Sequence, residues 1–394
     1  MTARSLPRAP VELLRRADRA AAHRSGRRRI LVDALTPVNY ALIARVHARM
    51  RADPRVSFYF TASDEPRRMG EIYAQAPPDI HLIHPARAAL MHFDAYIASD
   101  FMWPWLPRGT CRIQSFHGVA GKYGFDAPTE SMRQWDRLFF INQRRLRNFV
   151  ACGAIDADSA AIRLVGMPKT DGVVDGTFAR DAVLESLGLD PARPSVLYAP
   201  TRSPESSLNT MGMDLVRALM RLPITLMVKL HDRQRDLRQP FSGGVDWVAQ
   251  LTPLLRGHAA LAPGADISPY LVAADVMVTD HSSAGFEFLL RDRPLVRIHM
   301  PALIEHANIH PDYVELLAST SQSVADAAGA VSAVERGIAD PLAQSASRRA
   351  VSADLFYRPG TATSRFVAEL YEAVALDAPL ASRTAQEGQC RLSA

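Results

Sequence analysis

The sequence predicts an α/β fold made of two Rossmann-like domains that face each other across a cleft. The chain has 394 residues, which is too long for one ordinary core and suits two domains. Short apolar runs alternate with helical patterns from residue 29 onward, as in parallel sheets that are covered on both faces. The alternation begins again near Ser195 without any repetition of the sequence.

The apolar runs set the expected elements. In the first half, we expect a helix at 38–50 and strands at 29–35, 56–60, 94–98, 111–116, 137–141 and 162–165. In the second half, we expect helices at 211–222, 267–273 and 284–290. The second set of strands is expected at 196–198, 224–230, 259–261, 276–279 and 295–298. The chain therefore divides into an N-terminal arm at 1–28, domains at 29–170 and 171–376, and a loose polar tail at 377–394.

Composition excludes several classes of protein. Cys111, Cys152 and Cys390 are too few and too scattered for a disulfide framework or a metal site, so we expect a cytoplasmic protein without a structural metal. No apolar stretch is long enough to span a membrane. Positive charge is spread out without an aromatic stripe, which argues against nucleic-acid binding. Nearly all basic residues are arginines, and the chain has only three lysines, Lys122, Lys169 and Lys229.

The N-terminal arm has the pattern of a basic amphipathic helix. Arg15, Arg16, Arg19 and Arg24 interleave with leucines and alanines. Such a segment is either a solvated surface helix or a peripheral contact with an anionic membrane face. The sequence leaves both alternatives open.

Two motifs follow predicted strands and carry histidines. His117 lies in the segment 114–126, which also contains Gly118 and Lys122. Glycines let backbone N–H groups approach an anion, and a histidine at a strand exit can act as a general base. His231 closes the strand that contains Lys229 and could hold a diphosphate or assist its departure. The alternatives are a hydrogen-bonded loop histidine at 117 and a structural pair with Asp232 at 231.

Two further motifs place hydroxyl groups after strands of the second domain. Thr201, Arg202 and Ser203 follow the first strand, where they bind phosphate or merely cap the next helix. Thr279 and Asp280 end a later strand, and Ser282 and Ser283 begin the helix after it. The free N–H groups of a first helical turn attract anions, and Glu287 lies one turn further, where it could accept hydrogen bonds from ribose hydroxyls. The alternative is an ordinary helix cap.

Taken together, these motifs resemble the CDP-glycerol glycerophosphotransferase family, which makes teichoic-acid-type polymers and has the glycosyltransferase-B fold. The resemblance covers roughly residues 90–300, and the motifs occur in the family's order. Phe116-His117-Gly118 with Lys122 and Gly124 matches Trp-His-Gly with its Lys and Gly, and Leu197 to Thr201 matches Leu-Tyr-Ala-Pro-Thr. Asp275 to Ser283 with Phe286-Glu287 matches the last motif, with His281 in place of tyrosine and Glu287 in place of aspartate. The family's His-Pro is matched at His231 only, since Asp232 replaces the proline.

The resemblance implies transfer of glycerol phosphate from CDP-glycerol to a hydroxyl of a glycan or lipid-linked acceptor. The first domain would hold the acceptor and the second the nucleotide donor, with His117 and His231 as catalytic residues. The donor or its phosphates would be bound by Gly118, Lys122, Thr201, Arg202, Ser203, Lys229, Thr279, Asp280, Ser282, Ser283 and Glu287. The reaction implies no cofactor beyond this donor substrate.

Three alternatives stay open from the sequence. The first is a nucleotide-sugar glycosyltransferase or nonhydrolysing epimerase of the same fold, although the acidic residues that an epimerase needs cannot be assigned. The second is a catalytically silent module that binds nucleotides within a capsule-assembly complex. The third, a nucleic-acid binder, is disfavoured by the dispersed charge.

Overall fold

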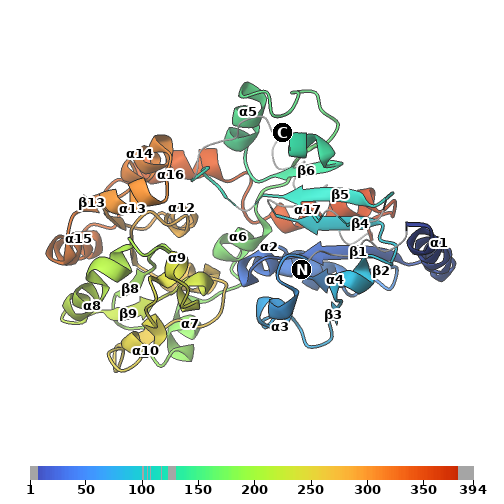
Figure 1. The fold of residues 1–394 in the computed structure, drawn as a ribbon. Coiled ribbons are helices and arrows are strands. Elements are labelled where there is room, and N and C mark those ends of the chain that lie inside the picture. Colours follow the sequence, from blue (N-terminus) through green and yellow to red (C-terminus); the bar gives the residue numbers. More distant parts are fainter. Residues whose placement is uncertain are drawn as a thin grey trace.

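The computed structural model describes residues 8–99, 102–103, 105–106, 108–116, 118–122 and 130–379, which fold into two α/β lobes (Figure 1). The sheet of the first lobe has the strand order β3-β2-β1-β4-β5-β6-β7, and all of its strands are parallel. Its strands are β1 (Arg28–Asp33), β2 (Val56–Thr61), β3 (His81–Leu82), β4 (Ala95–Ala98), β5 (Cys111–Ser115), β6 (Arg137–Phe140) and β7 (Ile162–Leu164).

The sheet of the second lobe is also parallel, with the order β10-β9-β8-β11-β12-β13. Its strands are β8 (Ser195–Tyr198), β9 (Thr225–Val228), β10 (Ala259–Leu261), β11 (Val276–Thr279), β12 (Leu295–Ile298) and β13 (Gln322–Val324). In both lobes the order reverses beside the first strand, and ligands of such sheets bind at the carboxyl ends of the strands near that point. In the second lobe this point lies between β8 and β11.

Helices cover the faces of both sheets. They are α1 (Arg8–Ser25), α2 (Pro37–Met50), α3 (Met69–Ile72), α4 (Pro85–Ala88), α5 (Gln143–Ala151), α6 (Pro168–Val174), α7 (Arg180–Ser186), α8 (Ser207–Leu219), α9 (Gln239–Ser242), α10 (Trp247–Leu251), α11 (Ser268–Ala273), α12 (Ala284–Phe288), α13 (Pro301–His306), α14 (Pro311–Ala318), α15 (Ala327–Ala339), α16 (Ser345–Leu355) and α17 (Ala362–Ala373). Short 3₁₀ turns complete them at η1 (Pro66–Arg68), η2 (Glu130–Gln134), η3 (Asp232–Arg235) and η4 (Leu289–Arg291).

Every strand that the apolar runs predict is present, and the structure adds β3 and β13. Both added strands are short and lie at a sheet edge. His81 and Leu82 of β3 are exposed, and no residue of β13 is buried. Because neither strand carries a buried apolar run, the sequence pattern gives no sign of them.

The basic N-terminal segment forms α1, which packs on the first lobe at the end remote from the second lobe (Figure 1). Asp18 anchors it, since its carboxylate pairs with Arg29 at 2.7 Å and accepts a hydrogen bond from the His92 backbone at 2.7 Å. Arg15 donates to the carbonyl of Ala89 at 2.7 Å. On this helix Leu13 and Leu14 stay 70% and 53% exposed.

Helix α17 returns to the first lobe, whereas the sequence division groups it with the second domain. Phe366 of α17 packs edge-on against Phe139 of β6, with ring centroids 4.7 Å apart. Glu369 pairs with Arg163 of β7 at 2.7 Å. The difference arises because α17 buries its apolar face on a sheet that lies far away in the sequence, which local patterns cannot reveal.

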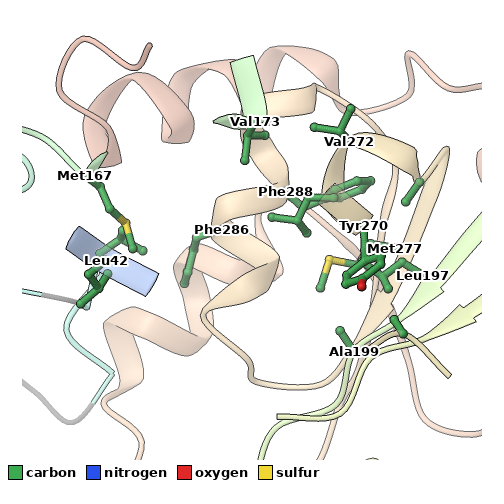
Figure 2. Close-up of a cluster of buried hydrophobic side chains, with 14 of the residues drawn as sticks. Leu42, Met167, Val173, Leu197, Ala199, Tyr270, Val272, Met277, Phe286 and Phe288 are labelled. Carbon is green, nitrogen blue, oxygen red and sulfur yellow. The ribbon is translucent and has the colours of Figure 1, made fainter. Parts of the chain in front are cut away.

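The hydrophobic core continues from one lobe into the other. One cluster of buried residues includes Leu42 and Met167 as well as Phe286 and Phe288 of α12 (Figure 2). Helix α6, which links the lobes, contributes Val173 to the same cluster. The two lobes are therefore joined by packed side chains beside the cleft.

Within the described residues, none of the helices has the length and apolar character that a membrane-spanning segment requires.

Candidate active site between the lobes

A cavity of about 440 Å³ lies between the lobes and brings the four sequence motifs together. The first lobe contributes Val38, Leu42 and the loop 118–122. The second lobe contributes residues that follow β8, β9 and β11. This is the place expected for a ligand of two parallel sheets, because the carboxyl ends of their strands face the same crevice.

The structure places most of the predicted site residues on the wall of this cavity. These are Gly118, Lys122, Thr201, Arg202, Lys229, His231, Ser282, Ser283 and Glu287. Ser203, Thr279 and Asp280 do not line it. His117 and Gly124 lie outside the described residues, although Phe116 and Gly118 flank His117 in the chain.

The glycine loop 118–122 is held by hydrogen bonds to its carbonyl groups. Arg145 donates to the Gly118 carbonyl at 2.7 Å, and the Asn142 side chain donates to that of Val119 at 2.8 Å. From the second lobe, the backbone N–H of His310 donates to the Lys122 carbonyl at 2.9 Å. Gly121 has a φ of 63°, a left-handed conformation that glycine adopts at little cost. The loop is thus fixed to both lobes.

Lys122 reaches across the cleft. Its ammonium group donates to the hydroxyl of Thr201 at 3.2 Å and lies 5.9 Å from the centre of the Tyr313 ring. Burial lowers the pKa of Lys122 to about 8, while the charge of Asp280 opposes this shift. A cation from the first lobe therefore stands beside the loop of the second lobe that carries Thr201 and Arg202.

Asp280 supports that loop from behind the cavity wall. It is fully buried and accepts hydrogen bonds from the Thr201 backbone at 2.8 Å and from the Ser207 backbone and hydroxyl at 3.0 and 2.9 Å. The Thr279 hydroxyl donates to the Ala199 carbonyl at 2.6 Å, and the Ser203 hydroxyl accepts from the Glu205 backbone at 3.1 Å. These groups shape the loop, whereas the sequence assigns them to direct contact with the donor.

At the end of β9, His231 is paired with Asp232. Burial alone would raise the pKa of Asp232, but the His231 charge and hydrogen bonds outweigh it and lower this pKa to about 2. The Nδ1 atom of His231 also lies 3.1 Å from the Arg233 backbone nitrogen, at the start of η3. These contacts engage Nδ1, so Nε2 is the ring nitrogen that a ligand in the cavity would meet.

The side chain of Lys229 forms hydrogen bonds to backbone carbonyl groups. Its side chain is buried, and its ammonium group donates to the carbonyls of Leu230 at 2.9 Å and Gly264 at 2.7 Å. Burial lowers the pKa of Lys229 to about 8. Lys229 thereby holds the segment around Gly264 against the end of β9. The next residue, Ala265, lines the cavity.

The start of α12 presents Ser282 and Ser283 to the cavity. The Ser282 hydroxyl lies 3.4 Å from the Ala284 backbone nitrogen, and Ser283 occupies the N-cap position without a side-chain capping bond. One turn later, Glu287 pairs with Lys169 of α6 at 2.7 and 2.9 Å. Both side chains are buried. The Lys169 ammonium group therefore balances the charge of the carboxylate that the sequence assigns to donor binding.

The sequence motifs miss Lys169, Arg145 and Tyr313, which also line the cavity. The sequence held a signal for Lys169, because it is one of only three lysines in an arginine-rich chain. All three lysines line this cavity. Arg145 and Tyr313 lie within ordinary helical patterns, and nothing in the sequence distinguishes them as site residues. Among the described residues, no group of three or more histidine, cysteine, aspartate or glutamate side chains is arranged to hold a metal ion.

Comparison with known families decides between the functional alternatives. The model of the CDP-glycerol:poly(glycerophosphate) glycerophosphotransferase family matches residues 39–368, which is most of the chain. The chain belongs to this family. It is therefore an enzyme of the glycerophosphotransferase class, which confirms the activity that the sequence motifs imply. No curated protein matches the chain.

Solved structures confirm the fold of this glycerophosphotransferase. The wall teichoic acid polymerase TagF matches with a TM-score of 0.66 and 14% identity, over 89% of this chain and 90% of that one. A putative UDP-N-acetylglucosamine 2-epimerase from Listeria monocytogenes matches with a TM-score of 0.57 and 14% identity, over 90% and 98% of the two chains. At such identities these matches establish the two-lobed glycosyltransferase-B type of fold, which the epimerases share, and the family model assigns the activity.

Proposed function

We propose that this glycerophosphotransferase moves glycerol phosphate from CDP-glycerol to a hydroxyl of a glycan or lipid-linked acceptor, during synthesis of a teichoic-acid-like or capsule polymer. The observation that carries the proposal is the convergence of Lys122, Thr201, Arg202 and the Ser282–Ser283 turn on one cavity between the lobes. Cationic and hydroxyl groups at that density suit a diphosphate.

The diphosphate of the donor would lie between Lys122 and the start of α12. Lys122 and Arg202 supply charge, and Gly118, Thr201, Ser282 and Ser283 supply hydrogen-bond donors from the same wall. Glu287 accepts hydrogen bonds from the ribose hydroxyls. Ser203, Thr279, Asp280 and Lys229 act indirectly, by holding the loops that carry these groups.

In the chemical step, the acceptor oxygen attacks the phosphorus atom that bears the glycerol. The bond from this phosphorus to the bridging oxygen breaks, and CMP leaves with that oxygen. His117 takes the proton of the attacking hydroxyl, and His231 donates a hydrogen bond to the departing phosphate through Nε2. Catalysis of this kind depends on positioning and charge stabilisation more than on covalent chemistry.

The test compares variants in a CMP-release assay with CDP-glycerol and a glycerol-phosphate-primed acceptor. We expect His117→Ala to lower turnover about 10²–10⁴-fold, as loss of a general base does. His306→Ala is the matched control, since this exposed histidine of α13 lies away from the cavity. Near-normal turnover of His117→Ala would refute the assignment of the base.

The same assay would reveal a departure from the activity of the family. Release of UDP from UDP-sugars without release of CMP from CDP-glycerol would favour a nucleotide-sugar enzyme. Binding of CDP without turnover on any acceptor would favour a silent nucleotide-binding module.

We also propose that α1 makes a peripheral contact with the anionic inner face of the cell membrane. The helix is basic, exposes Leu13 and Leu14, and lies beside Trp105, which is 58% exposed and whose carbonyl accepts a hydrogen bond from Arg15 at 3.3 Å. Exposed apolar side chains amid arginines suit an anionic lipid surface. Co-sedimentation with phosphatidylglycerol vesicles should weaken in Leu13→Ser/Leu14→Ser, and unchanged co-sedimentation would refute the contact.

A further inference from the structure

A second cavity, of about 600 Å³, adjoins the donor cavity between the lobes. The two cavities share Asp232 and Ala265 in their walls. The charged residues that line the second cavity are Arg68 and Glu71 on the first lobe and Asp232, Arg235, Asp236 and Arg238 on the second. A chain-like ligand that lies in this cavity can therefore extend into the donor cavity.

Three arginines lie around the ring of Phe241 of α9. The guanidinium carbons of Arg202, Arg233 and Arg238 lie 5.7, 4.6 and 4.9 Å from the centre of its ring. Arg202 belongs to the wall of the donor cavity and Arg238 to that of the second cavity. We call these three side chains and the ring the arginine platform.

The platform carries more positive charge than its neighbours balance. Arg238 pairs with Asp236 at 2.6 Å and lies 4.0 Å from Glu65 of the other lobe. For Arg202 and Arg233, no carboxylate lies within ion-pair distance among the described residues. Burial lowers the pKa of Arg233 and the charge of Arg202 lowers it further, while the charges of Asp232 and Glu65 oppose this shift without cancelling it. Like charges held this close repel one another, and a bound anion would relieve that repulsion.

We propose that the arginine platform binds phosphodiester groups of the acceptor chain and leads its terminal hydroxyl to the donor. The proposal rests on the proposed function, since it assumes a phosphodiester-containing acceptor. A planar guanidinium forms paired hydrogen bonds to phosphate oxygens, and contact with the Phe241 ring gathers the three guanidinium groups at one place. The donor alone does not account for Arg238, which lines only the second cavity, or for Arg233, which lies against the same Phe241 ring and lines neither cavity.

The experiment measures two affinities on the full chain. A fluorescently labelled, short glycerol-phosphate oligomer is titrated by anisotropy, and CDP is titrated by calorimetry. We expect Arg233→Gln and Arg238→Gln each to weaken oligomer binding about tenfold, the effect of one lost charge-assisted contact, and to leave CDP binding unchanged. Arg233→Lys, which keeps the charge, should recover part of the affinity.

Arg217→Gln is the control, because this exposed arginine of α8 pairs with Asp214 and lies outside both cavities. Unchanged oligomer affinity in both platform variants would overturn the proposal, and so would an equal loss of CDP affinity. Binding of phosphatidylglycerol vesicles that depends on Arg233, without oligomer binding, would overturn it in favour of a lipid headgroup. Failure of the proposed function is distinct, since the unmodified enzyme would then release no CMP from CDP-glycerol.

Discussion

Lys169 of α6 and Glu287 of α12 form a buried ion pair that joins the connection between the lobes to the wall of the active-site cavity. The ammonium group donates to both carboxylate oxygens, at 2.9 and 2.7 Å. Both residues line the cavity, and their side chains are 6% and 7% exposed. The pair places a neutralised carboxylate next to the proposed diphosphate site, where an unpaired one would repel the donor.

Loss of Lys169 should therefore harm both folding and donor binding. We expect Lys169→Met to lower the free energy of unfolding by about 3 kcal/mol, because it leaves a buried carboxylate without its counter-charge. CDP affinity should fall as well. Calorimetric titration and urea unfolding measure the two effects.

The double variant Lys169→Met/Glu287→Gln is the control for this prediction. It should recover much of the lost stability, since no unpaired charge remains. If the losses of unfolding free energy in Lys169→Met and Glu287→Gln, measured separately, simply add in the double variant, the pair does not act as a unit and the prediction fails.

Donor affinity should depend on pH through Lys122. Burial lowers the pKa of this lysine to about 8, and the protonated form is the one that attracts phosphate. CDP affinity should thus fall as the pH rises through about 8. Lys122→Arg should remove this dependence, because arginine stays charged.

The measurement is CDP binding between pH 7 and pH 9.5. An unchanged pH dependence in Lys122→Arg would contradict the prediction. It would instead assign the effect to Lys229, whose pKa burial also lowers to about 8.

Asp280 should matter for binding without touching the donor. Asp280→Ala leaves the Thr201 and Ser207 N–H groups without their acceptor, at a cost of about 3 kcal/mol in unfolding free energy. We expect CDP affinity to fall and Asp280→Asn to have a smaller effect. Asp214→Asn, at an exposed position on α8, is the control. Full CDP affinity in Asp280→Ala would show that the loop needs no support.

His281 should make the fold sensitive to acid. Its ring is fully buried, and Nδ1 has no hydrogen-bond partner within the described part of the chain. Burial, and then the charges of Arg297 and Lys122, lower its pKa from 6.5 to about 3. The unfolded chain takes up the proton first, so stability is lost as the pH falls from about 6.5 toward 3.

The expected contribution is up to about 1.4 kcal/mol per pH unit within that window. His281→Phe keeps a ring of similar size and should flatten the dependence in urea unfolding between pH 7 and pH 4.5. An identical slope in the variant and in the unmodified protein would rule out His281 as the acid-sensitive group.

Local patterns were sufficient for the strands that carry the site. Val276–Thr279 is a buried apolar run followed at once by polar residues, and the structure places a strand and a cavity wall there. The same holds at the end of β9, before His231. Such features are readable because a buried parallel strand needs several consecutive apolar residues and its carboxyl end is where ligands bind.

Other features depend on residues far apart in the chain. No local signal indicates that Lys169 pairs with Glu287, that Asp280 turns away from the cavity to hold Thr201, or that α17 covers the first sheet. The role of His117 stays a sequence-based proposal, since the structure describes only its neighbours.

The sequence by itself determined the two parallel sheets, the positions of the motifs at strand ends and the family, because each follows from contiguous residues. Only the tertiary structure decided which motif side chains face the cavity, which support it from behind, and that three arginines gather around Phe241. The physical reason is that hydrogen bonds, ion pairs and burial depend on distances in space, which the packing of the two lobes creates.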